Sequence, residues 1–291
     1  MKKAKATCPS SLSFIFKAIL PKENKIRQIS ISDLLTYYSR YGSVGVGCTI
    51  DKKVTVEVSR SQTNRLTFNG EKLNLPTVWR AVSFLAKDQL EINISSPLPL
   101  GCGFGISGAA TLASLWAIRR LFNLKESSEK LALISHFAEI AEKTGLGTVA
   151  TQITGGFLVK KKAGIPPRFR ELPLLGEKIY AVKLRPMATA KVLEDKRKLS
   201  DINYYADAAL TKINSIKNPT LKEIINISYE FYRKSKIFDS KKGEQLIKVI
   251  TKQGGSATMA IIGEVIFCNV EPILSDSYKI YELTISKDTV S

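Results

Sequence analysis

The sequence predicts a globular protein of mixed strands and helices, divided into two domains. Its 291 residues suffice for two domains of ordinary size. Hydrophobic residues make up 44% and charged residues 24%, a balance typical of folded and not of disordered chains. Each half contains strand-like segments followed by helix-like ones, and Ala163-Gly-Ile-Pro-Pro separates the halves. We therefore expect two domains, 1–164 and 165–291.

The first half contains three strand-like segments with apolar or alternating residues, at 13–19, 53–58 and 90–94. Its predicted helices cover 76–86, 107–122 and 128–143. The helix from 107 has no charge in its first three turns, which predicts burial on most sides. The helix from 128 should end before Gly145.

Residues 42–47, Gly-Ser-Val-Gly-Val-Gly, are too rich in glycine for a regular element by sequence criteria. They predict a loop where a backbone or a ligand passes closely, because glycine has no side chain to obstruct the approach.

In the second half, strands are expected at 157–160, 179–184 and 265–270, and helices near 200–215, 220–235 and 242–252. The last dozen residues are polar, so we expect them to fray.

The compartment predicted from the sequence is the cytoplasm. No run approaches the roughly 18 apolar residues of a membrane helix, and the basic start Met1-Lys-Lys is not followed by the apolar stretch of a signal peptide. The cysteines are scattered, which indicates reduced thiols and neither a disulfide framework nor a zinc site. They are Cys8, Cys48, Cys102 and Cys268.

The formal net charge of +18 permits three interpretations: a solvated basic surface, attraction of anionic small molecules, or binding of nucleic acid. The lysines and arginines occur in short, scattered groups such as Lys160-Lys-Lys162 and Lys196-Arg-Lys198. This distribution favours the solvated surface and disfavours a nucleic acid partner.

The strongest local signal is Pro99-Leu-Gly-Cys-Gly-Phe-Gly-Ile-Ser-Gly-Ala109, between a predicted strand and a predicted helix. Alternating glycines let successive backbone N–H groups converge on one point. The helix start adds unpaired N–H donors and the positive end of the helix dipole, so it favours an anion. Ser107 can offer a hydroxyl to a phosphate oxygen or to Mg²⁺. The motif therefore predicts a phosphate-binding loop.

Three other interpretations of this loop compete with phosphate binding. It could be a turn that merely lets strand and helix pack closely. A P-loop requires a Gly-Lys-Ser/Thr sequence, and no lysine follows here. Residues 103–108 match the dinucleotide pattern G-x-G-x-x-G, but no earlier βαβ unit and no ribose-binding acid are evident.

This glycine loop resembles the second motif of the GHMP small-molecule kinases, and other segments resemble their archaeal pantoate kinase branch. The residues from Cys8 to Phe16 are similar to the amino-terminal C-P-G-H-I-T-x-F-F of that branch, and residues 42–47 to its G-S-x-G-x-G. Residues 144–156 resemble T-G-L-G-D-V-x-x-Q-x-x-G-G, and residues 255–264 resemble its carboxy-terminal S-M-A-M-L-G-E segment.

The resemblance implies an α+β GHMP kinase fold, with a first domain like domain 2 of ribosomal protein S5 and a ferredoxin-like second domain. It implies phosphorylation of pantoate by ATP to 4-phosphopantoate, a step towards coenzyme A. It also allows a homodimer. Two alternatives stay open: a kinase of this fold for another small hydroxy acid or alcohol, and a non-catalytic relative that binds nucleic acid.

By the resemblance, ATP contacts come from the glycine loop and from a third motif near residue 255. These residues are Pro99, Gly101, Gly103, Gly105, Ser107, Gly108, Ala109, Gly255 and Ser256. Ser107 and Glu139 are the expected Mg²⁺ ligands, since this cation prefers hard oxygen atoms. Thr148 occupies the position of the expected aspartate base, and threonine cannot act as a general base near pH 7.

The substrate contacts implied by the resemblance are Ser11, Ser13, Ser43 and Lys160. Lys160 stands where the family shows a basic residue, and it would meet the substrate carboxylate as a point charge. Ser10-Ser11 replaces the Gly-His of the family, which motivates the alternative substrates. His136, the single histidine, and both tryptophans are predicted to be structural.

Overall fold

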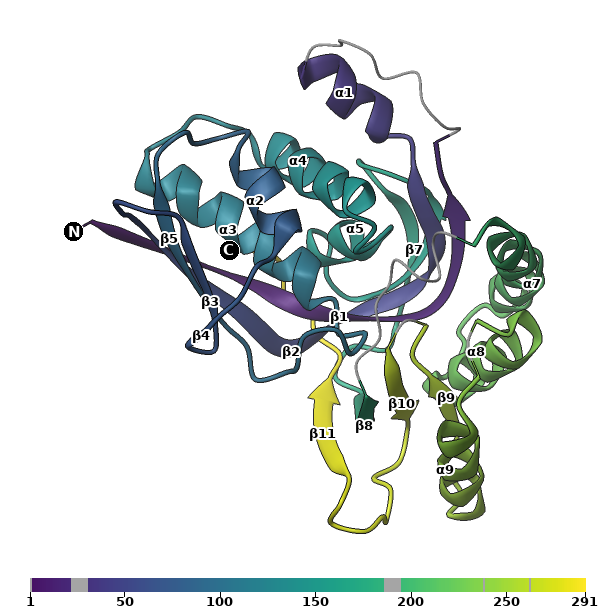
Figure 1. The fold of residues 1–291 in the computed structure, drawn as a ribbon. Coiled ribbons are helices and arrows are strands. Elements are labelled where there is room, and N and C mark those ends of the chain that lie inside the picture. Colours follow the sequence, from purple (N-terminus) through teal and green to yellow (C-terminus); the bar gives the residue numbers. More distant parts are fainter. Residues whose placement is uncertain (1, 22–30, 186–194, 238, 262) are drawn as a thin grey trace.

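The computed structural model describes residues 2–21, 31–185, 195–237, 239–261 and 263–291 (Figure 1). Within these ranges two sheets are surrounded by helices. The larger sheet has the order β4-β3-β5-β2-β6-β7, with β1 paired to β2. Its strands are β1 (Lys3–Ile19), β2 (Gly42–Arg60), β3 (Arg65–Phe68), β4 (Glu71–Lys72), β5 (Leu90–Ser95), β6 (Phe157–Lys162) and β7 (Arg168–Leu172).

The smaller sheet is antiparallel throughout and has the order β11-β8-β10-β9. Its strands are β8 (Lys178–Arg185), β9 (Ala257–Met259), β10 (Glu264–Cys268) and β11 (Lys279–Thr284). The fold is therefore of the predicted α+β class, because nearly all strand pairs in both sheets are antiparallel and the helices are grouped apart from them.

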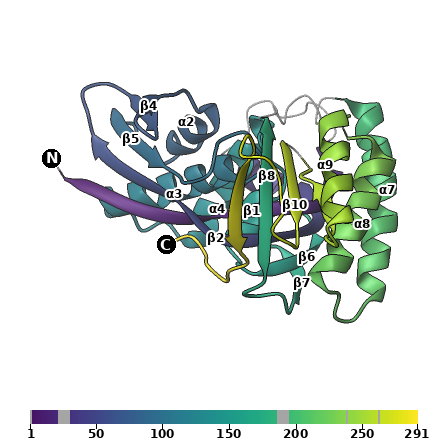
Figure 2. The same cartoon turned by 90° about the horizontal axis from the view of Figure 1, so that it is seen from below.

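The helices form two groups. α1 (Ile31–Tyr38), α2 (Pro76–Val82), α3 (Ile106–Leu121), α4 (Ser128–Ala141) and α5 (Thr148–Gln152) accompany the larger sheet. α7 (Lys196–Ser215), α8 (Leu221–Ser235) and α9 (Lys241–Lys252) form a layer beside the smaller sheet, as Figure 2 shows from below. No helix of the described residues is long and apolar enough to cross a membrane.

Helix α3 is central to the first group and packs on β1 and β2. Its small and aliphatic residues from Gly108 to Ile118 are all buried, which confirms the prediction made from its lack of charge. Trp116 is 5% exposed and lies in the core. The start of α3, which carries the glycine loop, is thereby held on a rigid support.

The predicted loop at residues 42–47 is wrong, because these residues form the first third of β2 and pair with β1. A Cβ atom on Gly45 would collide with the carbonyl oxygen of Ile15, and one on Gly47 would lie 2.6 Å from that of Leu12. The pairing also shifts register between Ser13 and Ile15. The glycines therefore serve a close approach of two backbones, as predicted, but inside a strand.

The expectation that the last residues fray is also wrong. The N–H of Ser291 donates to the carbonyl of Thr7 at 2.9 Å, and the N–H of Thr7 donates back at 2.8 Å. The N–H of Ser286 donates to the carbonyl of Thr49 at 3.0 Å. Strand β11, which the sequence did not predict, returns the chain to the larger sheet, and backbone hydrogen bonds then hold the polar tail.

The larger sheet extends beyond the expected domain boundary, since β7 pairs with β6. The tail from Ile285 also lies against it. We propose that the two domains expected at 1–164 and 165–291 correspond to the two sheets, with β7 and the tail belonging to the larger one.

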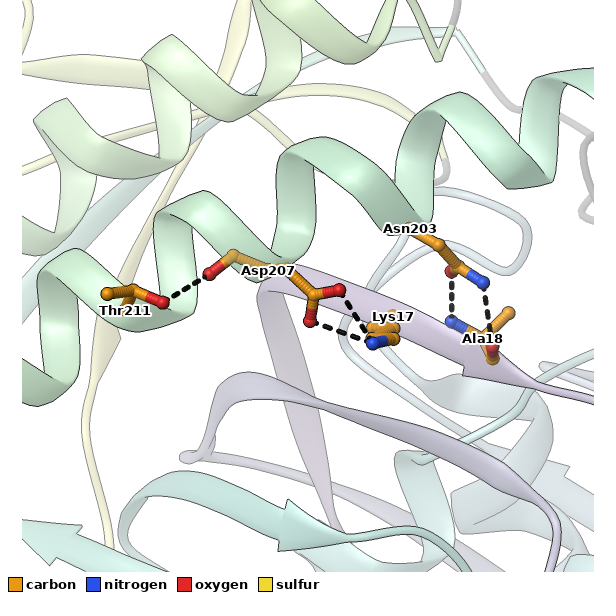
Figure 3. Close-up of polar contacts among 5 residues, drawn as sticks. All are labelled: Lys17, Ala18, Asn203, Asp207 and Thr211. Atoms are coloured by element: carbon orange, nitrogen blue, oxygen red, sulfur yellow. Dashed lines mark hydrogen bonds and ion pairs between the residues drawn. The ribbon is translucent and has the colours of Figure 1, made fainter.

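Helix α7 is attached to β1 by polar contacts (Figure 3). The side-chain amide of Asn203 brackets Ala18, accepting from its N–H at 2.8 Å and donating to its carbonyl at 3.0 Å. One turn on, Asp207 accepts from Lys17 Nζ at 2.7 and 2.8 Å. The amide and the ion pair together fix the helix layer to the long β1–β2 ribbon.

Candidate active site

A pocket of about 370 Å³ lies where β1, β2, the glycine loop and the turn after α4 meet. Most of the candidate residues line this one pocket. They are Ser11, Ser13, Ser43, Gly101, Gly103, Gly105, Ser107, Gly108, Glu139, Thr148 and Lys160. Four other candidates, Pro99, Ala109, Gly255 and Ser256, do not line it. The fold thus gathers residues from across more than half of the chain.

The glycine loop adopts the curled conformation that its sequence favours. Gly101, Gly103 and Gly105 all have positive φ angles, of 74°, 79° and 64°. Gly105 is the N-cap of α3, and no side chain caps the helix, so the first turn keeps its N–H donors available. The N–H of Ser11 donates to the carbonyl of Phe104 at 3.0 Å and anchors the loop to β1.

Ser107 and Glu139 face the pocket from two buried helices. Ser107 lies in the first turn of α3, and Glu139 on α4 is only 2% exposed. Thr144 Oγ1 donates to Glu139 Oε1 at 3.4 Å, while Oε2 has no hydrogen-bond partner among the described residues. Burial raises the pKa of Glu139 to about 7.

The orphaned Oε2 fits a divalent cation, since a hard oxygen atom without a partner is the ligand that Mg²⁺ takes. No cluster of three or more His, Cys, Asp or Glu occurs among the described residues. Mg²⁺ commonly needs only one or two protein oxygens and takes the rest from phosphates and water. Ser107 and Glu139 are therefore compatible with a metal that arrives with a nucleotide.

Thr148 begins α5 and turns its methyl group towards the glycine loop. Its Cγ2 lies 2.8 Å from the position that a Cβ atom on Gly105 would take, and 3.1 Å from the corresponding position on Gly108. Besides Glu139, the carboxylate that lines the pocket is Glu142, which is ion-paired with Arg80. Apart from Glu139, the expected metal ligand, no unpaired carboxylate among the described lining residues replaces the expected aspartate.

Lys160 lies on β6, and its side chain is buried against Gly147, the residue that precedes α5. It is 8% exposed, and its Nζ donates to the carbonyl of Gly147 at 3.5 Å. Burial lowers its pKa to about 7. Ser43 Oγ is directed at the same place, since both Ser43 Oγ and Lys160 Nζ would collide with a Cβ atom on Gly147. A hydroxyl and an ammonium group side by side can receive a carboxylate.

His136 has a structural role, as the sequence analysis expected. The imidazole is 1% exposed, and its Nε2 donates to the carbonyl of Tyr41 at 2.8 Å. Burial lowers the pKa of His136 to about 4, so the ring is neutral near pH 7.

Sequence reasoning missed two contributions to the site. Gln152, completely buried on α5, donates through Nε2 to the carbonyl of Gly105 at 2.9 Å. Ile261 lines the pocket, and a Cβ atom on Gly263 would lie 2.7 Å from the N atom of Gly103. The carboxy-terminal segment thus approaches the glycine loop through residues 261 and 263, whereas Ser256 bonds to Asn269. The roles assigned to Gly255 and Ser256 stay predictions.

Residues 76–156 match the family described as "GHMP kinases N terminal domain". These residues include the glycine loop, Glu139 and Thr148. A solved structure described as "Phosphotransferase related to CoA biosynthesis pathway" superposes with a TM-score of 0.78 at 19% identity, covering 100% of this chain and 98% of that one. The segment with the glycine loop is thus similar to the amino-terminal domain of GHMP kinases, and the whole chain has the fold of the solved phosphotransferase.

Along most of its length, the chain is similar to archaeal pantoate kinases. The pantoate kinase of Methanocaldococcus jannaschii is 28% identical over 234 residues, which are 78% of this chain and 83% of the relative. That of Methanospirillum hungatei is 27% identical over 257 residues, 84% of this chain and 86% of the relative.

Proposed function

We propose that the protein transfers the γ-phosphoryl group of ATP to the 4-hydroxyl of pantoate, giving 4-phosphopantoate and ADP. The observation that carries this proposal is the shared pocket: a phosphate-binding loop and the pair Ser43–Lys160 line the same cavity. The glycine loop suits a polyphosphate, and the pair Ser43–Lys160 suits a carboxylate. The similarity to pantoate kinases along most of the chain selects the substrate.

The glycine loop would hold the polyphosphate by its N–H groups and by the positive end of α3. Ser107 and Glu139 would hold Mg²⁺, which neutralises phosphate charge when it is bound. Lys160 and Ser43 would bind the carboxylate of pantoate and so orient its hydroxyl. Positioning of this kind accounts for most of the catalysis in phosphoryl transfer.

The proton of the attacking hydroxyl needs no protein base in this scheme. Thr148 cannot accept it, and Glu142 is engaged by Arg80. A loose transition state leaves the hydroxyl proton in place until late, so it can pass to the transferred phosphoryl group or to water. We therefore assign Thr148 a packing role beside the glycine loop.

The test is direct. Purified protein is incubated with Mg²⁺, ATP and pantoate, and phosphorus NMR follows the loss of ATP and the appearance of a phosphomonoester. We expect product only when all three are present. Absence of the new ester together with unchanged ATP would refute the proposal.

A second candidate acceptor is another small hydroxy acid, because Ser10-Ser11, in the middle of β1, stands where the resemblance implies Gly-His. Ser11 Oγ would collide with a Cβ atom on Gly105, so this side chain borders the phosphate loop itself. The same assay with mevalonate and homoserine separates the candidates. Turnover of either at a higher kcat/KM than pantoate would reassign the substrate.

A further inference from the structure

Two buried oxygen atoms in the candidate site lack partners, and both lie beside Gly108. They are Oε1 of Gln152 and Oε2 of Glu139, and neither has a hydrogen-bond partner among the described residues. The two residues are 0% and 2% exposed. Their oxygen atoms lie 3.0 and 3.1 Å from the position that a Cβ atom on Gly108 would occupy.

The orientation of the Gln152 amide follows from the contacts of its nitrogen, which also lies 3.5 Å from Ser11 Oγ. Nε2 lies 2.9 Å from the carbonyl oxygen of Gly105, which can only accept a hydrogen bond. The nitrogen must therefore face Gly105, and Oε1 must face Gly108. Gln152 thus connects α5 with the residue that starts α3.

In the ionised form that would bind a cation, Glu139 cannot bond directly to the amide oxygen of Gln152, because both groups then only accept hydrogen bonds. Leaving both unpaired in the interior would cost stability. A single water molecule carries two donors and matches this pair, and buried waters commonly satisfy such groups. Thr144 donates to Oε1 of Glu139, and each carboxylate oxygen keeps a second lone pair that a cation can use.

We propose that Gln152 is a positioning residue for Glu139, acting through one buried water that donates to both side chains. Gln152 then fixes the carboxylate relative to the glycine loop, because its two ends bind the loop and the water. The inference rests on the proposed function, in which Glu139 serves the Mg²⁺ bound with the nucleotide. Gln152 should therefore influence the part of nucleotide affinity that depends on the metal.

The experiment measures ADP dissociation constants by calorimetry, once with excess Mg²⁺ and once with EDTA. The metal enhancement is the dissociation constant in EDTA divided by the dissociation constant in Mg²⁺. Gln152→Met has a similar length and no amide, so we expect its enhancement to fall about fivefold from that of the unaltered protein. Gln152→Glu keeps an oxygen for the water, so its enhancement should be at least that of the unaltered protein, while ADP binding in EDTA weakens. Gln62→Met, at an exposed position, is the matched control.

If Gln152 only held the loop in shape, both dissociation constants would rise together and the enhancement would stay constant in both variants. That result would overturn the inference alone. If the unaltered protein bound no ADP under either condition, the proposed function would fail and the inference with it. Thermal unfolding of each variant checks the fold, and should Gln152→Met not fold, a reduced enhancement in Gln152→Glu would also overturn the inference.

Discussion

The ammonium nitrogen of Lys160 lies 3.5 Å from the carbonyl oxygen of Gly147. The residue lines the pocket and is only 8% exposed. The described residues offer it no carboxylate partner at ion-pair distance. Burial without a counter-ion lowers the pKa of Lys160 to about 7. An anionic substrate would supply the missing charge.

Substrate binding should therefore depend on pH through Lys160. Free Lys160 loses its proton as pH rises through about 7, and a carboxylate binds the protonated form. We expect pantoate affinity to fall by about tenfold per pH unit above that value, measured by calorimetry between pH 6 and 9. Lys160→Met should bind weakly and without this dependence. A pH profile that is the same in both proteins would exclude Lys160 as the carboxylate partner.

The free energy of unfolding should also depend on pH through the protonation of Lys160. The unfolded chain keeps the Lys160 proton up to about 10.5, whereas the folded protein releases it near 7. Between these values the unfolded state binds more protons, so the stability of the folded state rises with pH. We expect Lys160→Met to be the more stable protein at pH 6, by on the order of a few kcal/mol. Urea unfolding should show this difference shrinking as pH rises to 10.

Replacing Ser107 with alanine should lower kcat by about one to two orders of magnitude, because it removes one charge-assisted contact to the phosphate or its metal. The helix itself should persist, since alanine favours helices. ADP release in a coupled assay measures the effect. Ser200→Ala, at an exposed position on α7, is the control and should retain full activity. Normal turnover by Ser107→Ala would contradict the site assignment.

Thr148→Val keeps the methyl group that faces Gly105 and Gly108 but removes the hydroxyl. Since Thr148 is assigned to packing, we expect kcat to stay within about threefold of the unaltered protein. Loss of a general base would lower kcat much more, by roughly 100-fold or more. The same coupled assay measures it. A loss of that larger size would show that the hydroxyl takes part in the reaction.

Asn203→Ala should destabilise the protein by about 1–3 kcal/mol, because the backbone groups of Ala18 lose both of their side-chain partners. Lys17→Ala removes a surface ion pair and should cost less than about 1 kcal/mol. Urea unfolding measures both, with Asn214→Ala at an exposed position as the control. Equal losses for Asn203→Ala and Asn214→Ala would show that the amide does not anchor α7.

The curled conformation of the glycine loop could be predicted from the sequence because its signal is local. Three glycines at alternate positions before a helix leave few other conformations, and the φ angles of Gly101, Gly103 and Gly105 agree. The uncharged start of α3 likewise predicted its burial. The class of the fold and the convergence of the motifs came from the resemblance, and the pocket brings together most of the residues that it named.

The errors concern contacts between distant segments. Residues 42–47 have the composition of a loop, yet pairing with β1 makes them a strand, and local preference does not report that partner. The polar tail gave no sign that Ser291 would pair with Thr7. Gln152 is polar on a five-residue helix, and its contact with Gly105 spans 47 positions. No periodicity within α5 could have revealed it.

Around the pocket, four glycines leave room for polar side chains. A methyl group at these positions would strike a side chain that lines or borders the pocket: Gly105 meets Ser11, Gly108 meets Gln152, Gly145 meets Glu139, and Gly147 meets Ser43. At each of these four positions, the missing Cβ atom of glycine makes room for a polar side chain of a neighbouring residue. Replacing each of these four glycines with alanine would therefore test how closely its polar neighbour must pack for the pocket to keep its shape.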